Sequence, residues 1–132
     1  MGKTYVITSA LVKFEDKYLI AKRSANKKFA PNQWEFISGF VDTKEGAENI
    51  ILRELMEELK LKGKIIKSAE PYVVNDKEAR WMVIPFLIKL DNNSFVMNKK
   101  DHSEVKFVTS KELTKYKELS KDINEFRKRG LI

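Results

Sequence analysis

Three glutamates within five residues place the strongest constraint on this sequence. Glu54, Glu57 and Glu58 belong to the stretch Gly39–Leu61, whose pattern predicts the end of a strand, a polar loop and a helix. At helical spacing these carboxylates are i, i+3 and i, i+4 neighbours, and each like-charged i, i+4 contact costs roughly 0.2–0.5 kcal/mol in an isolated helix. A cation bound between these carboxylates would replace their repulsion with a favourable interaction. The stretch therefore predicts either a solvated acidic helix face or a metal site.

The other side of the same helix is apolar. At 100° per residue, one arc of the helix carries Leu52, Leu55, Met56 and Leu59, across from the glutamates. One face is expected to pack on a core while the other presents carboxylates. Gly63 is the expected helix stop, because a left-handed residue commonly follows the last turn.

The composition limits the chemistry that the 132 residues can carry. They fit one domain, 1–132, and 42% hydrophobic and 34% charged residues are ordinary for a globular protein. The absence of cysteine excludes disulfides and thiolate zinc sites, and a single histidine excludes most imidazole metal sites. Any metal is therefore expected to be held by oxygen. With no signal peptide or apolar run long enough to span a membrane, the expected location is the cytoplasm, with no membrane partner.

The net charge of +7 comes from 26 Lys and Arg against 19 Asp and Glu. A basic protein attracts phosphate-bearing partners, including nucleotides and RNA. The lysines are scattered along the chain rather than clustered, so a solvated Lys-rich surface is favoured over a dedicated RNA patch.

The remaining pattern alternates strands and helices. Thr109 with Glu112 forms a capping box at a helix start, and Pro85 argues against a central position for its strand. The expected elements are a hairpin of Thr4–Phe14 and Tyr18–Ala21, a strand Trp34–Gly39, a break at 43–46, strands Lys64–Val74, Arg80–Leu90 and Val105–Val108, and a last helix Ser120–Arg129. This order favours a mixed sheet covered by helices.

The spacing of the central stretch resembles the Nudix box. Gly39 is followed after five residues by Glu45, and after seven more by the run Arg53–Glu58 and then Leu61. The strand Trp34–Phe36 is also similar to the one that precedes the box in many family members. The resemblance implies an α/β/α sandwich with a central mixed sheet flanked by helices. It also implies hydrolysis of a nucleoside diphosphate linked to another group, with Mg²⁺ or Mn²⁺ as cofactor.

Matching positions imply site roles. Glu57 and Glu58 are the expected main metal ligands, with Glu54 as a further ligand or the base that orients the water. The backbone carbonyl of Ser38, just before the box glycine, is the position that often adds a metal ligand. Gly39 itself is expected among the substrate-binding residues. Carboxylate and carbonyl oxygens are the ligands that Mg²⁺ prefers, which agrees with this set.

Further candidates act around the box. Arg53 is expected to support catalysis by pairing with Glu45, which fixes the loop against the helix. Glu104 resembles the late-loop glutamate of family members and is a candidate base or ligand, or else a surface carboxylate. His102 is a candidate substrate contact, although capping or packing is the more common role. Arg23 is expected either to bind phosphate or to lie exposed on the surface.

Two positions depart from the box. Lys60 stands where the box has glycine, and because a left-handed lysine costs roughly 1 kcal/mol or more, the helix is expected to run on toward Gly63. Ile37–Phe40 resembles the variant found in NADH-pyrophosphatase-like members, whose zinc ribbon a cysteine-free chain cannot form. Trp34 is expected in the core more often than as a platform for a base.

These expectations favour a metal-dependent hydrolase that converts a nucleoside triphosphate to its monophosphate and pyrophosphate. The alternative within the same class is an ADP-ribose or dinucleotide pyrophosphatase. An alternative of another class is a module that binds nucleotide or RNA without catalysis. A pure binder has no need of Glu54, Glu57 and Glu58 together, so the complete set favours an enzyme.

Overall fold

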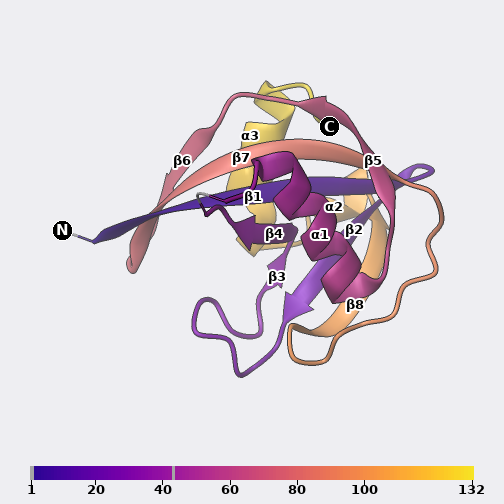
Figure 1. The fold of residues 1–132 in the computed structure, drawn as a ribbon, viewed down its shortest axis with the longest axis horizontal. Helices are drawn as coiled ribbons and strands as arrows, with labels where there is room; N and C mark the ends of the chain where they lie inside the picture. Colours follow the sequence, from indigo (N-terminus) through magenta and orange to yellow (C-terminus); the bar gives the residue numbers. More distant parts are fainter. Residues whose placement is uncertain (1, 43) are drawn as a thin grey trace.

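The computed structural model describes residues 2–42 and 44–132, so the predicted break at 43–46 is described except for Thr43 (Figure 1). Their secondary structure comprises an eight-stranded sheet, three α-helices and one 3₁₀ turn. The elements are β1 (Lys3–Phe14), β2 (Lys17–Arg23), β3 (Trp34–Glu35), β4 (Ile37–Phe40), α1 (Ala47–Leu59), β5 (Gly63–Ser68), β6 (Tyr72–Asn75), β7 (Ala79–Leu90), β8 (His102–Thr109), α2 (Ser110–Leu113), η1 (Lys117–Leu119) and α3 (Ser120–Lys128).

The sheet is covered on both faces, which confirms the predicted layers of helix, mixed sheet and helix (Figure 1). Successive residues of β1 point to opposite faces, as strand geometry requires. Ala10 and Val12 pack with Leu55 of α1, while Leu11 packs with Phe126 of α3. Two buried clusters therefore lie on either side of one sheet, with α1 on one face and α2 and α3 on the other.

The expected hairpin of β1 and β2 is present, but the two strands separate away from their turn. The two strands pair only near their turn, through Lys13 with Tyr18 and Phe14 with Lys17. Beyond that point β3 pairs with β2 and β4 pairs with β1, so the segment 34–40 changes partner at Phe36. The splayed strands make the room in which the functional site lies.

The prediction against a central position for the Pro85 strand was wrong. β7 runs parallel to β1 on one side and antiparallel to β5 and β6 on the other. Pro85 lies opposite the short gap between β5 and β6, where its carbonyl accepts from the Ala69 N–H at 3.3 Å. A missing N–H directed into this gap breaks no ladder bond. The same gap divides the predicted strand Lys64–Val74 in two.

The prediction that α1 runs on toward Gly63 was also wrong. The helix ends at Leu59, and Lys60 adopts the left-handed conformation with φ 56° and ψ 34°. Its N–H donates to the Met56 carbonyl, which satisfies one of the last free acceptors of the helix. Burial of Leu59 and Leu61 on either side fixes the chain and offsets the cost of this conformation.

The capping box at the start of α2 is confirmed. Thr109 Oγ1 accepts from the Glu112 N–H, and the Glu112 carboxylate accepts from the Thr109 N–H. The predicted last helix is confirmed as α3, and the predicted strand at 105–108 is longer, as β8. Within residues 2–42 and 44–132, the helices are all too short or too polar to cross a membrane.

Candidate active site

A cavity of about 410 Å³ lies where β1 and β2 separate. Its walls come from segments far apart in the sequence, including β4, α1, β7 and the loops before β3 and β8. Two groups of side chains define its character. One is a set of carboxylates that includes Glu54, Glu58 and Asp101, and the other is a set of aromatic rings that includes Phe29, Phe40 and Trp81.

Glu54 and Glu58 reach the cavity from α1 because they lie one turn apart on the same helix face. The helix comes very close to β4 at Gly39. A Cβ atom added at Gly39 would lie 2.7 Å from Glu54 Cγ and 3.1 Å from Ile50 Cγ2. Glycine at this position therefore lets the carboxylates lie against the strand, where Ser38 also lines the cavity.

Glu58 is the most perturbed acid of the site. Its side chain is only 10% exposed. Burial, a hydrogen bond with Glu54 and the charges of Glu35 and Asp101 raise the pKa of Glu58 from 4.5 to about 10. A hard divalent cation among these oxygens would remove the repulsion and favour the ionised form. The donor set thus fits the divalent cation that the resemblance implies.

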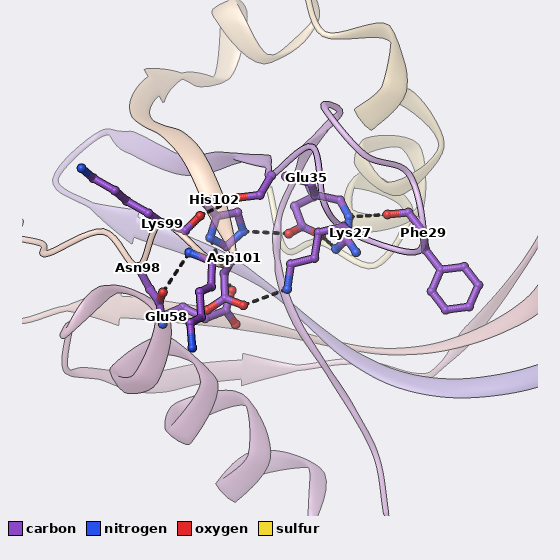
Figure 2. A network of polar contacts seen from close by, with 11 residues as sticks. Lys27, Phe29, Glu35, Glu58, Asn98, Lys99, Asp101 and His102 are labelled. Atoms are coloured by element: carbon purple, nitrogen blue, oxygen red, sulfur yellow. Dashed lines mark hydrogen bonds and ion pairs between the residues drawn. The ribbon is translucent and has the colours of Figure 1, made fainter.

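A chain of polar contacts connects Glu58 to the rest of the cavity (Figure 2). His102 is fully buried, with Nε2 2.8 Å from Glu35 Oε2 and Nδ1 3.5 Å from Glu58 Oε1. The other Glu35 oxygen accepts from Arg23 Nη1 at 2.8 Å, and Arg23 Nε donates to the Phe29 carbonyl at 2.7 Å. The structure therefore brings Arg23 and His102 together at the cavity through Glu35.

Sequence reasoning did not select Glu35 as a site residue, although the sequence contained a signal for it. A charged residue stands between Trp34 and Phe36 in a short apolar strand. Burying a carboxylate there is costly unless it is paired. Trp34 itself is half-buried against Tyr116 with ring centroids 5.4 Å apart, and it also lines the cavity.

The late loop delivers Asp101 to the cavity, while Glu104 lies elsewhere. Asp101 Oδ1 accepts from Lys27 Nζ at 2.8 Å in the cavity wall. Glu104 instead approaches Lys106 Nζ at 3.4 Å, with about half of its side chain exposed.

The physical reason for the position of Glu104 is a β-bulge. Glu104 pairs with Lys22 of β2, but His102 pairs with Arg23, so one extra residue of β8 lies between the two pairs. Paired residues share a face, and Lys22 and Arg23 point to opposite faces. The bulge therefore turns Glu104 away from the cavity that His102 faces.

Glu57 lies outside the described lining of the cavity. Its side chain is 59% exposed, and Arg53 Nε lies 3.5 Å from Glu57 Oε1. The expected pairing of Arg53 with Glu45 is present as an ion pair. Arg53 therefore connects the loop before α1 to the solvent side of that helix.

Three aromatic rings of the cavity, Phe29, Phe40 and Trp81, form one contiguous cluster with Tyr5. Tyr5 stacks on Trp81 with centroids 4.9 Å apart, and Phe29 meets Trp81 edge-on at 5.1 Å. Phe40 lies 5.7 Å from Tyr5, and the Trp81 indole N–H donates to Asp76 at 2.8 Å. Flat, partly exposed rings beside carboxylates suit a ligand with a planar base and a charged phosphate chain.

Comparisons with solved structures agree with this geometry. A MutT protein from Methanosarcina mazei Go1 has a TM-score of 0.77 at 19% identity, over 86% of this chain and 83% of that chain. The NUDIX domain of Shewanella oneidensis NrtR, complexed with ADP ribose, has a TM-score of 0.77 at 18% identity, over 97% and 89%. A C. elegans Ap4A hydrolase has a TM-score of 0.75 at 17% identity, over 94% and 93%. At such identities the likeness shows the fold.

The family follows from the sequence as well. A search of curated proteins found no significant match. The family model described as NUDIX domain, however, matches residues 4–129. The chain belongs to the Nudix family, and it is a Nudix hydrolase of the pyrophosphatase type.

Proposed function

We propose that this Nudix hydrolase converts a nucleoside triphosphate to its monophosphate and pyrophosphate. The observation that carries the proposal is the cavity itself, because one space holds both the carboxylates and the aromatic cluster. A volume of about 410 Å³ is in the range of small-molecule sites. The rings would take the base, and the acidic wall would take the phosphates with their cation.

The residues that would hold Mg²⁺ or Mn²⁺ are Glu54, Glu57, Glu58 and the carbonyl of Ser38. When bound, the cation neutralises phosphate charge and lowers the pKa of the attacking water. Glu54 orients that water and accepts its proton as the new phosphorus–oxygen bond forms and the anhydride bond breaks. The pyrophosphate leaves with the bridging oxygen.

Positive charge for the phosphates comes from Arg23 and Lys27, which both line the cavity. In the structure these cations pair with Glu35 and Asp101 respectively. A phosphate chain would compete with those carboxylates for the same donors, and a planar guanidinium suits bidentate phosphate contact. Lys27 was not selected from the sequence, because nothing there sets it apart from other loop lysines.

Two substrate classes remain as alternatives within the family. The NrtR domain complexed with ADP ribose covers more of this chain than the MutT protein does, at the same TM-score. The cavity that joins the acidic wall to the aromatic rings, with Arg23 and Lys27 in its lining, supports a triphosphate. A dinucleotide is the second alternative.

A substrate panel tests the proposal. Purified protein with Mg²⁺ would be given nucleoside triphosphates, nucleotide sugars, ADP-ribose, dinucleotides and capped RNA, with products identified by mass spectrometry. Monophosphate plus pyrophosphate from a triphosphate is the expected result. Preferred cleavage of ADP-ribose or a dinucleotide would overturn the triphosphate assignment. Release of no product, together with RNA binding that weakens steeply with salt, would overturn the enzyme assignment.

The cytoplasm is the proposed location, supported by the absence of cysteine from the sequence. Fractionation of cells with an antibody against the protein would test it, and recovery from an exported fraction would contradict it.

A further inference from the structure

We propose that His102 Nδ1 is a direct ligand of the divalent cation held by Glu58. The site would then combine nitrogen and oxygen donors and would prefer Mn²⁺, Co²⁺ or Zn²⁺ to Mg²⁺. The inference deepens the proposed function, on which it rests only in sharing Glu58. It also revises the expectation that oxygen alone holds the metal.

The hydrogen bonds of His102 define which ring nitrogen is free. Nε2 lies 2.8 Å from Glu35 Oε2, while the second Glu35 oxygen accepts from Arg23 Nη1. A carboxylate paired with arginine is an acceptor, so the imidazole proton lies on Nε2. In that tautomer the lone pair lies on Nδ1.

Nδ1 has no hydrogen-bond partner among the described residues, although the side chain is only 1% exposed. Glu58 Oε1 lies 3.5 Å away, which is longer than an ordinary hydrogen bond. Buried polar atoms in proteins are almost always satisfied, and an exception requires an explanation such as an ion. The atom without a partner thus lies 3.5 Å from the acid that the family resemblance assigns to the metal.

The spacing fits two ligands of one ion. Nitrogen and oxygen donors bind Zn²⁺ at about 2.0–2.2 Å, so two of them at a tetrahedral angle lie about 3.4 Å apart. The observed separation of Nδ1 and Glu58 Oε1 is 3.5 Å. The ligand atoms of Glu35, Glu58 and His102 all lie within 4.8 Å of one another.

Glu35 has a separate task in this arrangement. Metal-bound histidines usually donate their second N–H to a carboxylate, which fixes the tautomer and the ring orientation. Glu35 accepts from His102 with one oxygen (Figure 2), and Arg23 donates to its other oxygen. We therefore assign Glu35 as a positioning residue. Imidazole is a better ligand for later transition ions than for Mg²⁺, which gives the stated metal preference.

The single histidine makes a direct test practical, provided that the chain carries no histidine tag. Protein labelled with ¹⁵N-histidine and freed of metal would be titrated with Zn²⁺ while both ring nitrogens are followed by NMR. The expected result is one ring in which Nε2 stays protonated and the Nδ1 resonance shifts on binding. The proposal would be overturned if Nδ1 carries the proton in the metal-free protein, or if the Nδ1 chemical shift does not change when Zn²⁺ binds.

Calorimetry of three variants supplies a second measurement. His102→Gln keeps a polar atom near Glu35 but removes the Nδ1 donor, and it should lower Mn²⁺ affinity by at least about tenfold with little change for Mg²⁺. Glu35→Gln should lower the affinity for Mn²⁺ by about 10- to 100-fold. Glu70→Gln, an exposed carboxylate away from the cavity, is the matched control and should bind as wild type does.

The outcomes separate this inference from the proposed function. Metal binding is measured without nucleotide, so an Nδ1 shift in a protein that hydrolyses no nucleotide would support the ligand and refute the function. Nucleotide hydrolysis by a protein whose Nδ1 resonance does not shift with metal would support the function and refute the ligand. Equal Mn²⁺ affinity in wild type and His102→Gln would also overturn the ligand. Should His102→Gln fail to fold, the NMR titration of the wild-type chain decides alone.

Discussion

Glu57 and Glu58 are neighbours in the sequence but occupy opposite environments. Glu58 is 10% exposed among Glu54, His102 and Asp101, and its pKa is raised to about 10. Glu57 is 59% exposed and has Arg53 beside it. A step of 100° around α1 therefore separates a buried acid that has other acids around it from an exposed acid that lies beside an arginine. The burial and charge repulsion of the acidic helix face therefore act mainly on Glu58.

The largest test of this difference is the activity of two amide variants. Glu58→Gln should lower kcat/KM by at least about 10³-fold, because a metal that stabilises charge contributes several kcal/mol to the barrier. Glu57→Gln should lower it by only about 10- to 100-fold, because Glu57 is exposed beside Arg53 and would contribute less to holding the metal than Glu58 does. Hydrolysis assays with Mg²⁺ would measure both, with circular dichroism as the check on folding. Equal losses would remove the distinction between the two acids.

The next test is the effect of pH on stability without metal. Glu58 has a folded pKa of about 10 and an ordinary value of 4.5. Between these values the folded state holds one more proton than the unfolded state. The free energy of unfolding should therefore fall as pH rises, by up to about 1.4 kcal/mol per pH unit. This stabilising contribution is complete below pH 4.5 and is lost as pH rises through 10.

Glu58→Gln removes the titrating group and is the control for this slope. Urea denaturation with chelator at pH 6, 7 and 8 would measure both proteins. The free energy of unfolding of the variant, relative to that of wild type, should increase as pH rises. If the two proteins lose stability equally as pH rises, Glu58 does not have a raised pKa in the folded state.

The close approach of α1 to β4 is tested at glycine. Gly39→Ala should push Glu54 and Ile50 away from the strand, at a cost of about 1–3 kcal/mol in stability. Activity should fall with it, because Glu54 moves. Gly46→Ala is the matched control, since a Cβ there meets no atom within 4 Å. Thermal denaturation and hydrolysis assays would measure both, and similar behaviour of the two variants would contradict the close contact.

The smallest expected effect is at the end of α1. Lys60→Gly should stabilise the protein by about 1 kcal/mol, because lysine is strained at a φ of 56° and glycine is not. Neither Glu57 nor Glu58 should be affected, so activity should stay as in wild type. Chemical denaturation would measure the gain. A loss of stability would show that Lys60 makes contacts that outweigh its strain.

Local signals in the sequence predicted much of this architecture. The box spacing, the capping box of Thr109 with Glu112 and the alternation in β1 all depend on residues a few positions apart. Lys60 and Pro85 were misjudged because long-range packing and a gap in a neighbouring strand outweigh local preference. Glu104 was selected from the sequence and Asp101 was not considered, because the single-residue bulge that reverses the face leaves no mark in one sequence.

The site also illustrates this limit. Glu54 and Glu58 follow from helical spacing, but the contact of Glu35 with His102 joins positions 67 residues apart. No periodicity connects β3 to the start of β8. The aromatic cluster likewise draws Tyr5, Phe29 and Trp81 from three separate segments.

The parallel pairing of β1 with β7 has a consequence for the synthesis of this protein. Lys3 pairs with Ala79, 76 residues later in the chain. At about 5–20 residues per second, the ribosome needs about 4–15 s to deliver that partner. Meanwhile only β4 can cover β1 on its central residues, Ile7 to Ala10. Most of β1 therefore lacks its β7 partner in the nascent chain for several seconds, during which a chaperone can bind it.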